Sequence, residues 1–267
     1  MSALAEGGPS REPSREPRFW TPGFLVLMAG ALAALIVLVS LGNWQVRRMA
    51  WKEDLLATID ARRAAPPISL DMALERYSRE GDVDYTPVRV EGTFGPEEAL
   101  VHSTDSGQVG WQVLAPLELA DGRTVIVNRG FVPDGQKLVS KRPRSRPPAA
   151  PVVVTGLARD PILAKPNRFV PENDAGANVF YWKDYQALRA ALGLSAASTV
   201  GITLDAGPTP SGVLPRGGQT IVELPNNHFG YAVTWYGIAL GLVGVVFALV
   251  LQRLRRVRGG RREPPGV

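Results

Sequence analysis

The stretch FLVLMAGALAALIVLVSL, from Phe24 to Leu41, contains eighteen consecutive residues without a charge. An α-helix rises ~1.5 Å per residue, so about 20 such residues cross the ~30 Å hydrocarbon core of a bilayer. A second uncharged stretch, YAVTWYGIALGLVGVVFALVL, runs from Tyr231 to Leu251. The two stretches predict transmembrane helices, which we place at residues 22–42 and 231–251.

The first stretch has an alternative interpretation, a cleaved signal peptide. Its apolar run is longer than the ~7–15 residues of a signal core. No small-x-small cleavage site follows it, because the next residues are GNWQVRRMAWK. A retained membrane anchor is therefore favoured.

Small residues recur at helical spacing inside both stretches. Gly237 and Gly241 form a GxxxG pair, and Gly30 and Ala34 form a similar pair. Such positions allow close approach of helix backbones, but glycine is also common in membrane helices generally. Both interpretations stay open.

Arginines decide the orientation predicted for these spans, because Lys and Arg are enriched on the cytoplasmic side of membrane helices. The segment LPNNHFG before the second span has no basic residue other than histidine. Six arginines follow that span: Arg253, Arg255, Arg256, Arg258, Arg261 and Arg262. The tail 252–267 is therefore predicted to be cytoplasmic. With two spans the N-terminal segment 1–20 is cytoplasmic too, and its Gly, Pro, Ser, Arg and Glu content predicts disorder.

Residues 43–230 then form an extracytoplasmic domain in which strand patterns dominate. Strands are expected in YTPVRVEGTF, PVVVTGLA and VGITLDA, and a hairpin in GWQVLAPLEL and RTVIVNRGFV around the turn ADG. The first span is expected to continue as an amphipathic helix with Trp44 and Ile59 on one face, ended by AAPPISL. A short helix is expected in DYQALRAALGL, with Asp184 as its N-cap.

The predicted fold class is thus a membrane protein with two transmembrane α-helices flanking a β-rich α+β domain. Many short antiparallel strands favour an antiparallel barrel or sandwich. The basic, proline-rich loop over residues 133–151 has no predicted role.

Composition excludes several functions. The chain has no cysteine, which rules out disulfides and thiolate metal sites. Its net charge of +5 comes from arginines in the tail and from the cluster around Lys141–Arg146. This charge does not form a basic face interleaved with aromatics, so nucleic acid is not an expected partner. The expected contact is with the lipid bilayer.

Catalytic motifs such as GxSxG, HExxH and a Walker loop do not occur in the sequence. The segment VHSTDS holds His102, Ser103 and Asp105, and a hydrolase built on them is one alternative. Neighbouring strand residues face opposite sides of a sheet, so His102 is better explained as an exposed strand residue. The chain is predicted not to be an enzyme.

Two further segments contain candidate binding residues. In VNRGF, Arg129 stands at a strand end, where it either orients a carboxylate or braces the sheet, and Gly130 suggests a bulge or a close backbone approach. His228 precedes the second span, followed by Trp235 and Tyr236. Neutral imidazole is a common ligand of transition metals and haem iron. His228 is therefore either a metal ligand or an interfacial polar cap.

Five motifs, in this order along the chain, resemble the surfeit locus protein 1 family of cytochrome c oxidase assembly factors. They are LGNWQVRRMAWKEDLL, YTPVRVEGTF, GWQVLAPLELADGRTVIVNRGFVP, NVFYWKDY and NNHFGYAVTWYGIA. The resemblance covers roughly residues 35–250. Phe131 and Phe229 depart from residues common in the family, but both remain large and apolar.

The resemblance implies an inner-membrane protein with its β-domain on the outer face. The lack of cysteine, the short arginine-rich ends and the lack of an evident transit peptide favour a bacterial plasma membrane. Its implied role is to help mature haem–copper oxidase subunit I, with haem a received transiently from the haem a synthesis enzyme. His228 then matches a haem-binding histidine, Trp235 and Tyr236 could line the site, and Arg129 could hold a propionate. The alternative is a scaffold that stabilises an oxidase intermediate without binding haem.

Overall fold

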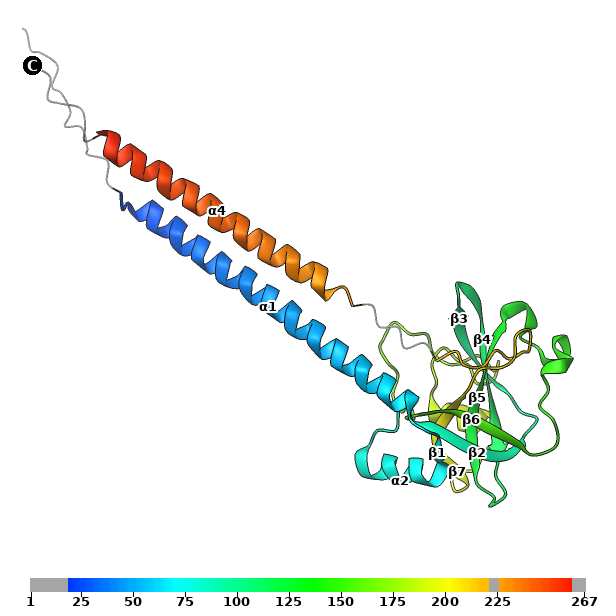
Figure 1. Ribbon diagram of the computed structural model, residues 1–267. Helices are drawn as coiled ribbons and strands as arrows, with labels where there is room; N and C mark the ends of the chain where they lie inside the picture. Colours follow the sequence, from blue (N-terminus) through cyan, green and yellow to red (C-terminus); the bar gives the residue numbers. More distant parts are fainter. Residues whose placement is uncertain (1–18, 221–225, 261–267) are drawn as a thin grey trace, which may run out of the picture. The chain divides into compact units, whose positions relative to one another are not determined.

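The computed structural model describes residues 19–220 and 226–260 of the 267-residue chain. The chain divides into two compact units (Figure 1). The helical unit comprises residues up to Asp54 together with those from Pro225 onward, and the barrel unit comprises Leu55–Leu224. The predicted disorder of the first eighteen residues lies outside the described residues.

Two helices, α1 (Pro22–Ala64) and α4 (His228–Gly260), are each long and apolar enough to cross a membrane. Apolar side chains such as Val26 and Leu240 are 73% exposed, as suits a surface that faces hydrocarbon. α1 runs without interruption through the predicted span and the predicted amphipathic helix, and it ends before the prolines of AAPPISL. The bilayer boundaries at 22–42 and 231–251 stay predictions.

The pairing of α1 with α4 depends on a glycine that the sequence patterns did not single out. A Cβ atom at Gly42 would lie 2.7 Å from the ring of Tyr236, so the close approach requires glycine. By contrast, a Cβ at Gly30, Gly237 or Gly241 would meet nothing within 4 Å among the described residues. Within the described chain these three glycines do not make the contact between the helices.

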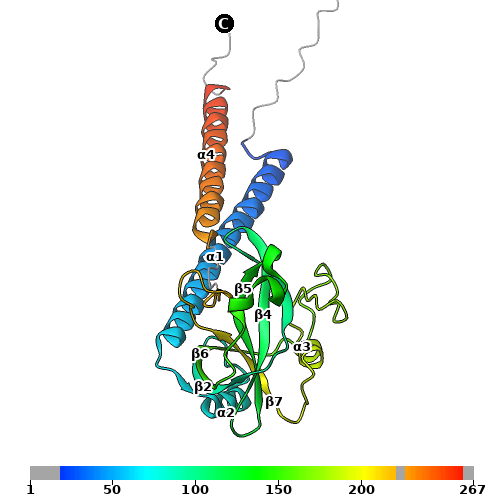
Figure 2. The same ribbon diagram turned by 90° about the vertical axis from the view of Figure 1, so that its right-hand side faces the viewer.

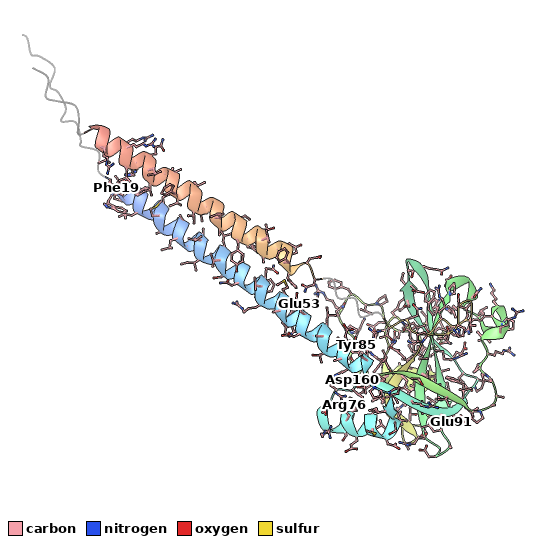
Figure 3. All side chains as sticks on the ribbon, viewed as in Figure 1. Phe19, Glu53, Arg76, Tyr85, Glu91 and Asp160 are labelled. Atoms are coloured by element: carbon pink, nitrogen blue, oxygen red, sulfur yellow. The ribbon has the colours of Figure 1, made fainter. Side chains whose placement is uncertain are left out.

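The other end of this helix pair is held by Arg253 of α4. Its Nε donates to the carbonyl of Phe19 (2.6 Å), which Figure 3 labels, and its Nη2 donates to Oγ1 of Thr21 (2.7 Å). The guanidinium also lies 4.5 Å from the centroid of the Phe24 ring, within cation–π distance. Polar contacts therefore join the start of α1 to the last turns of α4.

Among its described residues the barrel unit contains seven strands, and five of them close into a mixed barrel (Figure 2). The strands are β1 (Ile68–Ser69), β2 (Pro87–Phe94), β3 (Ala99–Asp105), β4 (Gln108–Glu118), β5 (Thr124–Pro133), β6 (Val152–Arg159) and β7 (Thr199–Ala206). Their order around the barrel is β2–β6–β7–β5–β4. Thr93 and Phe94 at the end of β2 pair with β4 and complete the circle. Only β5 and β7 run parallel within the barrel, an arrangement that matches a five-stranded OB-type barrel.

The core of the barrel follows from strand alternation. Val125 and Val127 of β5 pack in one buried cluster with Ile202 and Leu204 of β7, while Ile126 between them faces the other side of the strand and packs in a second buried cluster. The helix α2 (Leu70–Glu80) contributes Leu70 and Ala73 to this core, and α3 (Tyr185–Ala191) contributes Tyr185 and Leu188 to the second cluster. Three single 3₁₀ turns lie within Asp134–Ser145. α2 was not predicted from the sequence. It buries only Leu70 and Ala73, so its apolar pattern is too short to mark a helix.

The other local predictions are confirmed. β4 and β5 form the expected antiparallel hairpin around ADG, and Asp184 caps α3 by accepting from the backbone of Gln186 and Ala187. The expected bulge is present in β5. Val113 and Leu114 are consecutive in β4, but they pair with Gly130 and Asn128 of β5. Arg129 is therefore the extra residue of the bulge.

Candidate functional site

His228 is the first residue of α4, and its ring contacts a polar side chain of α1. Its Nδ1 lies 2.6 Å from Oε1 of Gln45, which is only 8% exposed. An amide oxygen can only accept, so Nδ1 carries the proton and donates it to Gln45. In the neutral imidazole the other ring nitrogen, Nε2, then keeps its lone pair. This is the tautomer that a metal-ligating histidine needs, with the supporting hydrogen bond in place.

One aromatic ring contacts this histidine, and the other predicted residues lie further along α4. The ring of Trp44 meets the His228 ring edge-on, with centroids 6.3 Å apart. One buried acceptor nearby, Oδ1 of Asn226, has no hydrogen-bond partner within the described residues. Tyr236 donates its hydroxyl to Oδ1 of Asn43 at 2.6 Å, one residue from the glycine it packs against. Trp235, beside it on α4, is half-buried, and its role stays a prediction.

The sequence LGNWQ therefore supplies most of the partners of the predicted α4 residues. Gln45 and Asn43 were not predicted as site residues, although both lie in the family-like motif LGNWQVRRMAWKEDLL. The signal that could have identified them is positional. LGNWQ follows the first apolar run and NNHFG precedes the second, so antiparallel spans bring the two motifs to the same end.

The donor set of this site fits a haem iron better than a protein-bound metal ion. Among the described residues, no three His, Asp or Glu side chains cluster as metal ligands. A single imidazole with a fixed Nδ1 hydrogen bond is the usual protein contribution to an axial haem ligand. Trp44 offers an apolar ring beside it.

Arg129 lies in the barrel unit, on the bulge of β5. It donates from Nη1 to Oε1 of Glu98 (3.2 Å) and from Nη2 to the backbone carbonyl of Ser145 (2.6 Å). Burial lowers its pKa, Glu98 opposes that shift, and the neighbouring Arg142 adds to it. Arg129 thus binds a carboxylate and a backbone corner of its own chain. Its predicted contact with a propionate stays a prediction.

A buried polar cluster inside the barrel unit was not predicted from the sequence. Asp205 of β7 accepts from Nδ2 of Asn128 (2.8 Å), from Nζ of Lys183 (3.1 Å) and from the hydroxyl of Thr220 (3.0 Å). Burial raises the pKa of Asp205, but Lys183, Asn128 and Arg159 outweigh burial and hold the pKa below its ordinary value. The cluster connects the segments VNRGF, YWKDY and GITLDA.

The segment VHSTDS does not form a catalytic arrangement. His102 is exposed, as expected, and its ring lies against Trp111 and Tyr181, with centroids 5.5 and 5.9 Å away. Asp105 is buried and pairs with Nη2 of Arg216 at 2.7 Å instead. The charged partner of the carboxylate is thus an arginine.

Fold and site define a class of protein: two candidate membrane helices that flank a small mixed barrel in the sequence, with a histidine at the start of the second helix hydrogen-bonded to the first. The SURF1 family matches residues 32–240. A SURF1-like protein of Monosiga brevicollis is 34% identical over 88% of this chain and 90% of its own length. Surfeit locus protein 1 of Xenopus tropicalis is 35% identical over 74% of this chain and 67% of its own length, and that of Homo sapiens 33% over 74% and 69%.

The chain therefore belongs to the SURF1 family, whose members are cytochrome c oxidase assembly factors without catalytic activity. The predicted family is confirmed. The hydrolase alternative on His102, Ser103 and Asp105 is not supported.

Proposed function

We propose that this protein assists assembly of cytochrome c oxidase by carrying haem a toward subunit I, with Nε2 of His228 as an axial ligand. The observation that supports this role is the hydrogen bond from Nδ1 to Gln45, which leaves Nε2 as the free ligand atom. When bound, the haem would be the cargo of the protein, and the chain itself performs no turnover. Its residues bind and orient that cargo.

The residues around His228 divide this work. Gln45 fixes the tautomer and the plane of the imidazole, and Trp44 provides an apolar ring beside it. Asn226, with its unpartnered buried oxygen, can accept a hydrogen bond from a bound group. The partners in this proposal are subunit I of the haem–copper oxidase and the enzyme that synthesises haem a.

The proposed location is a bacterial plasma membrane, with both termini cytoplasmic and the barrel unit outside the cytoplasm. The charge asymmetry supports this topology: the last turns of α4 carry Arg253, Arg255, Arg256 and Arg258. At the other end, residues 226–236 contain no Lys or Arg. Fusion of a periplasm-specific reporter to either terminus tests the topology.

A second function is favoured by the same hydrogen bond. The contact between His228 and Gln45 joins α4 to α1, so it could serve only to hold the two helices together in a scaffold. The two functions differ in what His228→Asn should do. An asparagine amide can still donate to Gln45, but it cannot replace imidazole as a haem ligand.

The test is a visible spectrum of the full chain, purified in detergent from cells that make both the protein and haem a. Haem carriage predicts a Soret band in wild type that is lost in both His228→Ala and His228→Asn. A scaffold predicts haem-free wild type and normal oxidase assembly with His228→Asn. Thr234→Val, which removes a hydroxyl bonded to the backbone carbonyl of Gly230 on the same helix, is the matched control.

A further inference from the structure

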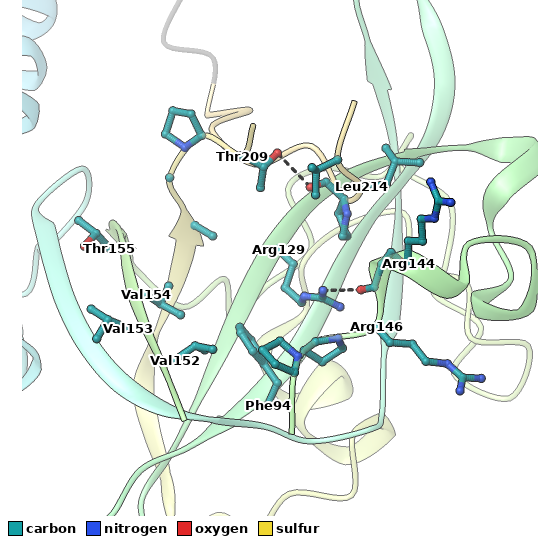
Figure 4. Close-up of a pocket in the computed structure, with 18 residues that line it drawn as sticks. Phe94, Arg129, Arg144, Arg146, Val152, Val153, Val154, Thr155, Thr209 and Leu214 are labelled. Atoms are coloured by element: carbon teal, nitrogen blue, oxygen red, sulfur yellow. Dashed lines mark hydrogen bonds between the residues drawn. The ribbon is translucent and has the colours of Figure 1, made fainter. Parts of the chain in front are cut away.

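The barrel unit has a cleft of ≈ 610 Å³ between β5 and the first half of β6. Ligand sites in proteins measure ~300–1,000 Å³, so the cleft is large enough to hold a ligand. Figure 4 shows Arg129, Arg144 and Arg146 on one side and Val152–Val154 on the other, with Phe94 below. All of these residues lie in the barrel unit, and Arg129 is the one among them that was also predicted to contact haem.

The arginine side of the cleft has more positive than negative charge. Glu98 is the carboxylate shared by two guanidiniums, those of Arg129 and Arg142, whose side chains are 12% and 2% exposed. Arg144 and Arg146 are exposed at the rim, and neither makes an ion pair with another residue in the part of the chain described. An anionic group entering the cleft would balance this charge.

The opposite side of the cleft is a strand edge. β6 pairs with β2 along Val152–Leu157, but with β7 only along Gly156–Arg159. The carbonyl of Thr155 faces the β7 side, where it accepts from the backbone of Gly207 at 2.9 Å. Backbone groups of successive strand residues point to opposite sides, so those of Val153 also face the β7 side. No described strand pairs with Val153 there.

These two sides require different features of one ligand. A free N–H and C=O on a strand edge recognise the backbone of an extended polypeptide. The arginines recognise carboxylates, while Phe94, Val154 and Leu214 offer an apolar lining to alternate side chains. A small amphipathic acid would use the arginines and the lining but would leave the Val153 edge unused.

We propose that this cleft binds an extended acidic polypeptide segment of a partner protein, which adds as a strand at Val153 and places carboxylates against Arg144 and Arg146. Strand addition gives affinity through the backbone, and the arginines select acidic sequences. The proposal does not depend on haem binding, because it uses only residues of the barrel unit.

The test uses the full chain in detergent and a fluorescein-labelled ten-residue peptide of alternating valine and glutamate, followed by fluorescence anisotropy. We expect saturable binding that is lost when lysine replaces glutamate in the peptide. Methylating alternate backbone nitrogens keeps the side chains but removes the donors, and should weaken binding about tenfold or more. Arg144→Glu combined with Arg146→Glu should weaken it by a similar factor of about ten.

The matched pair on the protein is Val153→Pro and Val153→Ala. Proline removes the backbone N–H, so binding should weaken about tenfold, whereas alanine keeps the N–H and should change it less than about twofold. The proposal is overturned if the methylated peptide binds as tightly as the unmethylated one. It is also overturned if neither Val153→Pro nor the double arginine reversal weakens binding. Sebacate, a plain dicarboxylate, is the competitor. If it displaces the peptide and Val153→Pro has no effect on binding, the cleft is a site for a small acid instead. An absence of peptide binding at millimolar concentration also overturns it.

Discussion

Gln45 and His228 are 183 positions apart in the sequence, yet Oε1 of the first lies 2.6 Å from Nδ1 of the second. The bond connects the two apolar helices and sets which imidazole nitrogen is free. The two effects can be separated by changing Gln45 rather than His228.

Replacing Gln45 with leucine should weaken haem binding without removing the ligand. Leucine is similar in size but accepts no hydrogen bond, so the imidazole loses the partner that fixes its orientation and tautomer. Loss of such a partner typically lowers metal affinity ~10–100-fold. Titration of haem into the purified full chain, followed at the Soret band, measures the change.

Gln45→Glu is the control for this prediction, because a carboxylate accepts the same hydrogen bond. It should retain haem and lower the reduction potential of the bound iron, since a negative acceptor makes the imidazole a stronger donor. Equal affinity of the leucine and glutamate variants would show that the Gln45 bond is structural only.

Adding one methyl group at Gly42 should disturb the pairing of α1 with α4. An alanine Cβ there would lie 2.7 Å from the Tyr236 ring, which is closer than van der Waals contact allows. Gly30→Ala on the same helix is the control, because its Cβ meets nothing within 4 Å. We expect Gly42→Ala, but not Gly30→Ala, to lower the yield of a disulfide engineered between the two spans. A smaller side chain at Tyr236 should restore that yield in the Gly42→Ala variant.

The sequence indicates elements better than it indicates which elements meet. The β4–β5 hairpin was predictable because the turn ADG lies between its strands. The parallel pairing of Asn128 with Asp205 was not, because three 3₁₀ turns, β6 and α3 lie between β5 and β7 and no local turn marks their contact. Gln45 was missed for a related reason. Its partner His228 lies 183 positions away, so no local pattern shows that the two side chains meet.

Gly130→Ala should destabilise the barrel. Gly130 has φ +121°, outside the region open to L-residues, and an added Cβ would lie 2.0 Å from the carbonyl oxygen of Arg216. Backbone strain alone costs ~1–3 kcal/mol at such a position, and the clash adds to that cost. Thermal unfolding of the full chain should show a clear loss of stability, whereas Gly135→Ala, with nothing within 4 Å of its Cβ, should be close to neutral. Equal melting of the two variants would contradict the observed bulge.

Asp205 should make the stability of the barrel unit depend on acid pH. Its folded pKa lies below its ordinary value because Lys183, Asn128 and Arg159 outweigh the effect of burial. A depressed folded pKa contributes stability that is fully present above the unfolded value of ~3.9 and is lost as pH falls through the folded pKa. Asp205→Asn should therefore lower the free energy of unfolding by roughly 1–3 kcal/mol at neutral pH, since Lys183 loses its charged acceptor.

The pH dependence separates this electrostatic role from a simple packing role. Urea unfolding of wild type and Asp205→Asn, followed by barrel tryptophan fluorescence at pH 7 and at pH values below ~4, gives the difference in unfolding free energy. That difference should shrink as pH falls, because wild-type Asp205 becomes protonated and its bonds with Lys183 and Asn128 weaken. A difference that stays constant with pH would mean that Asp205 stabilises the barrel through packing rather than charge.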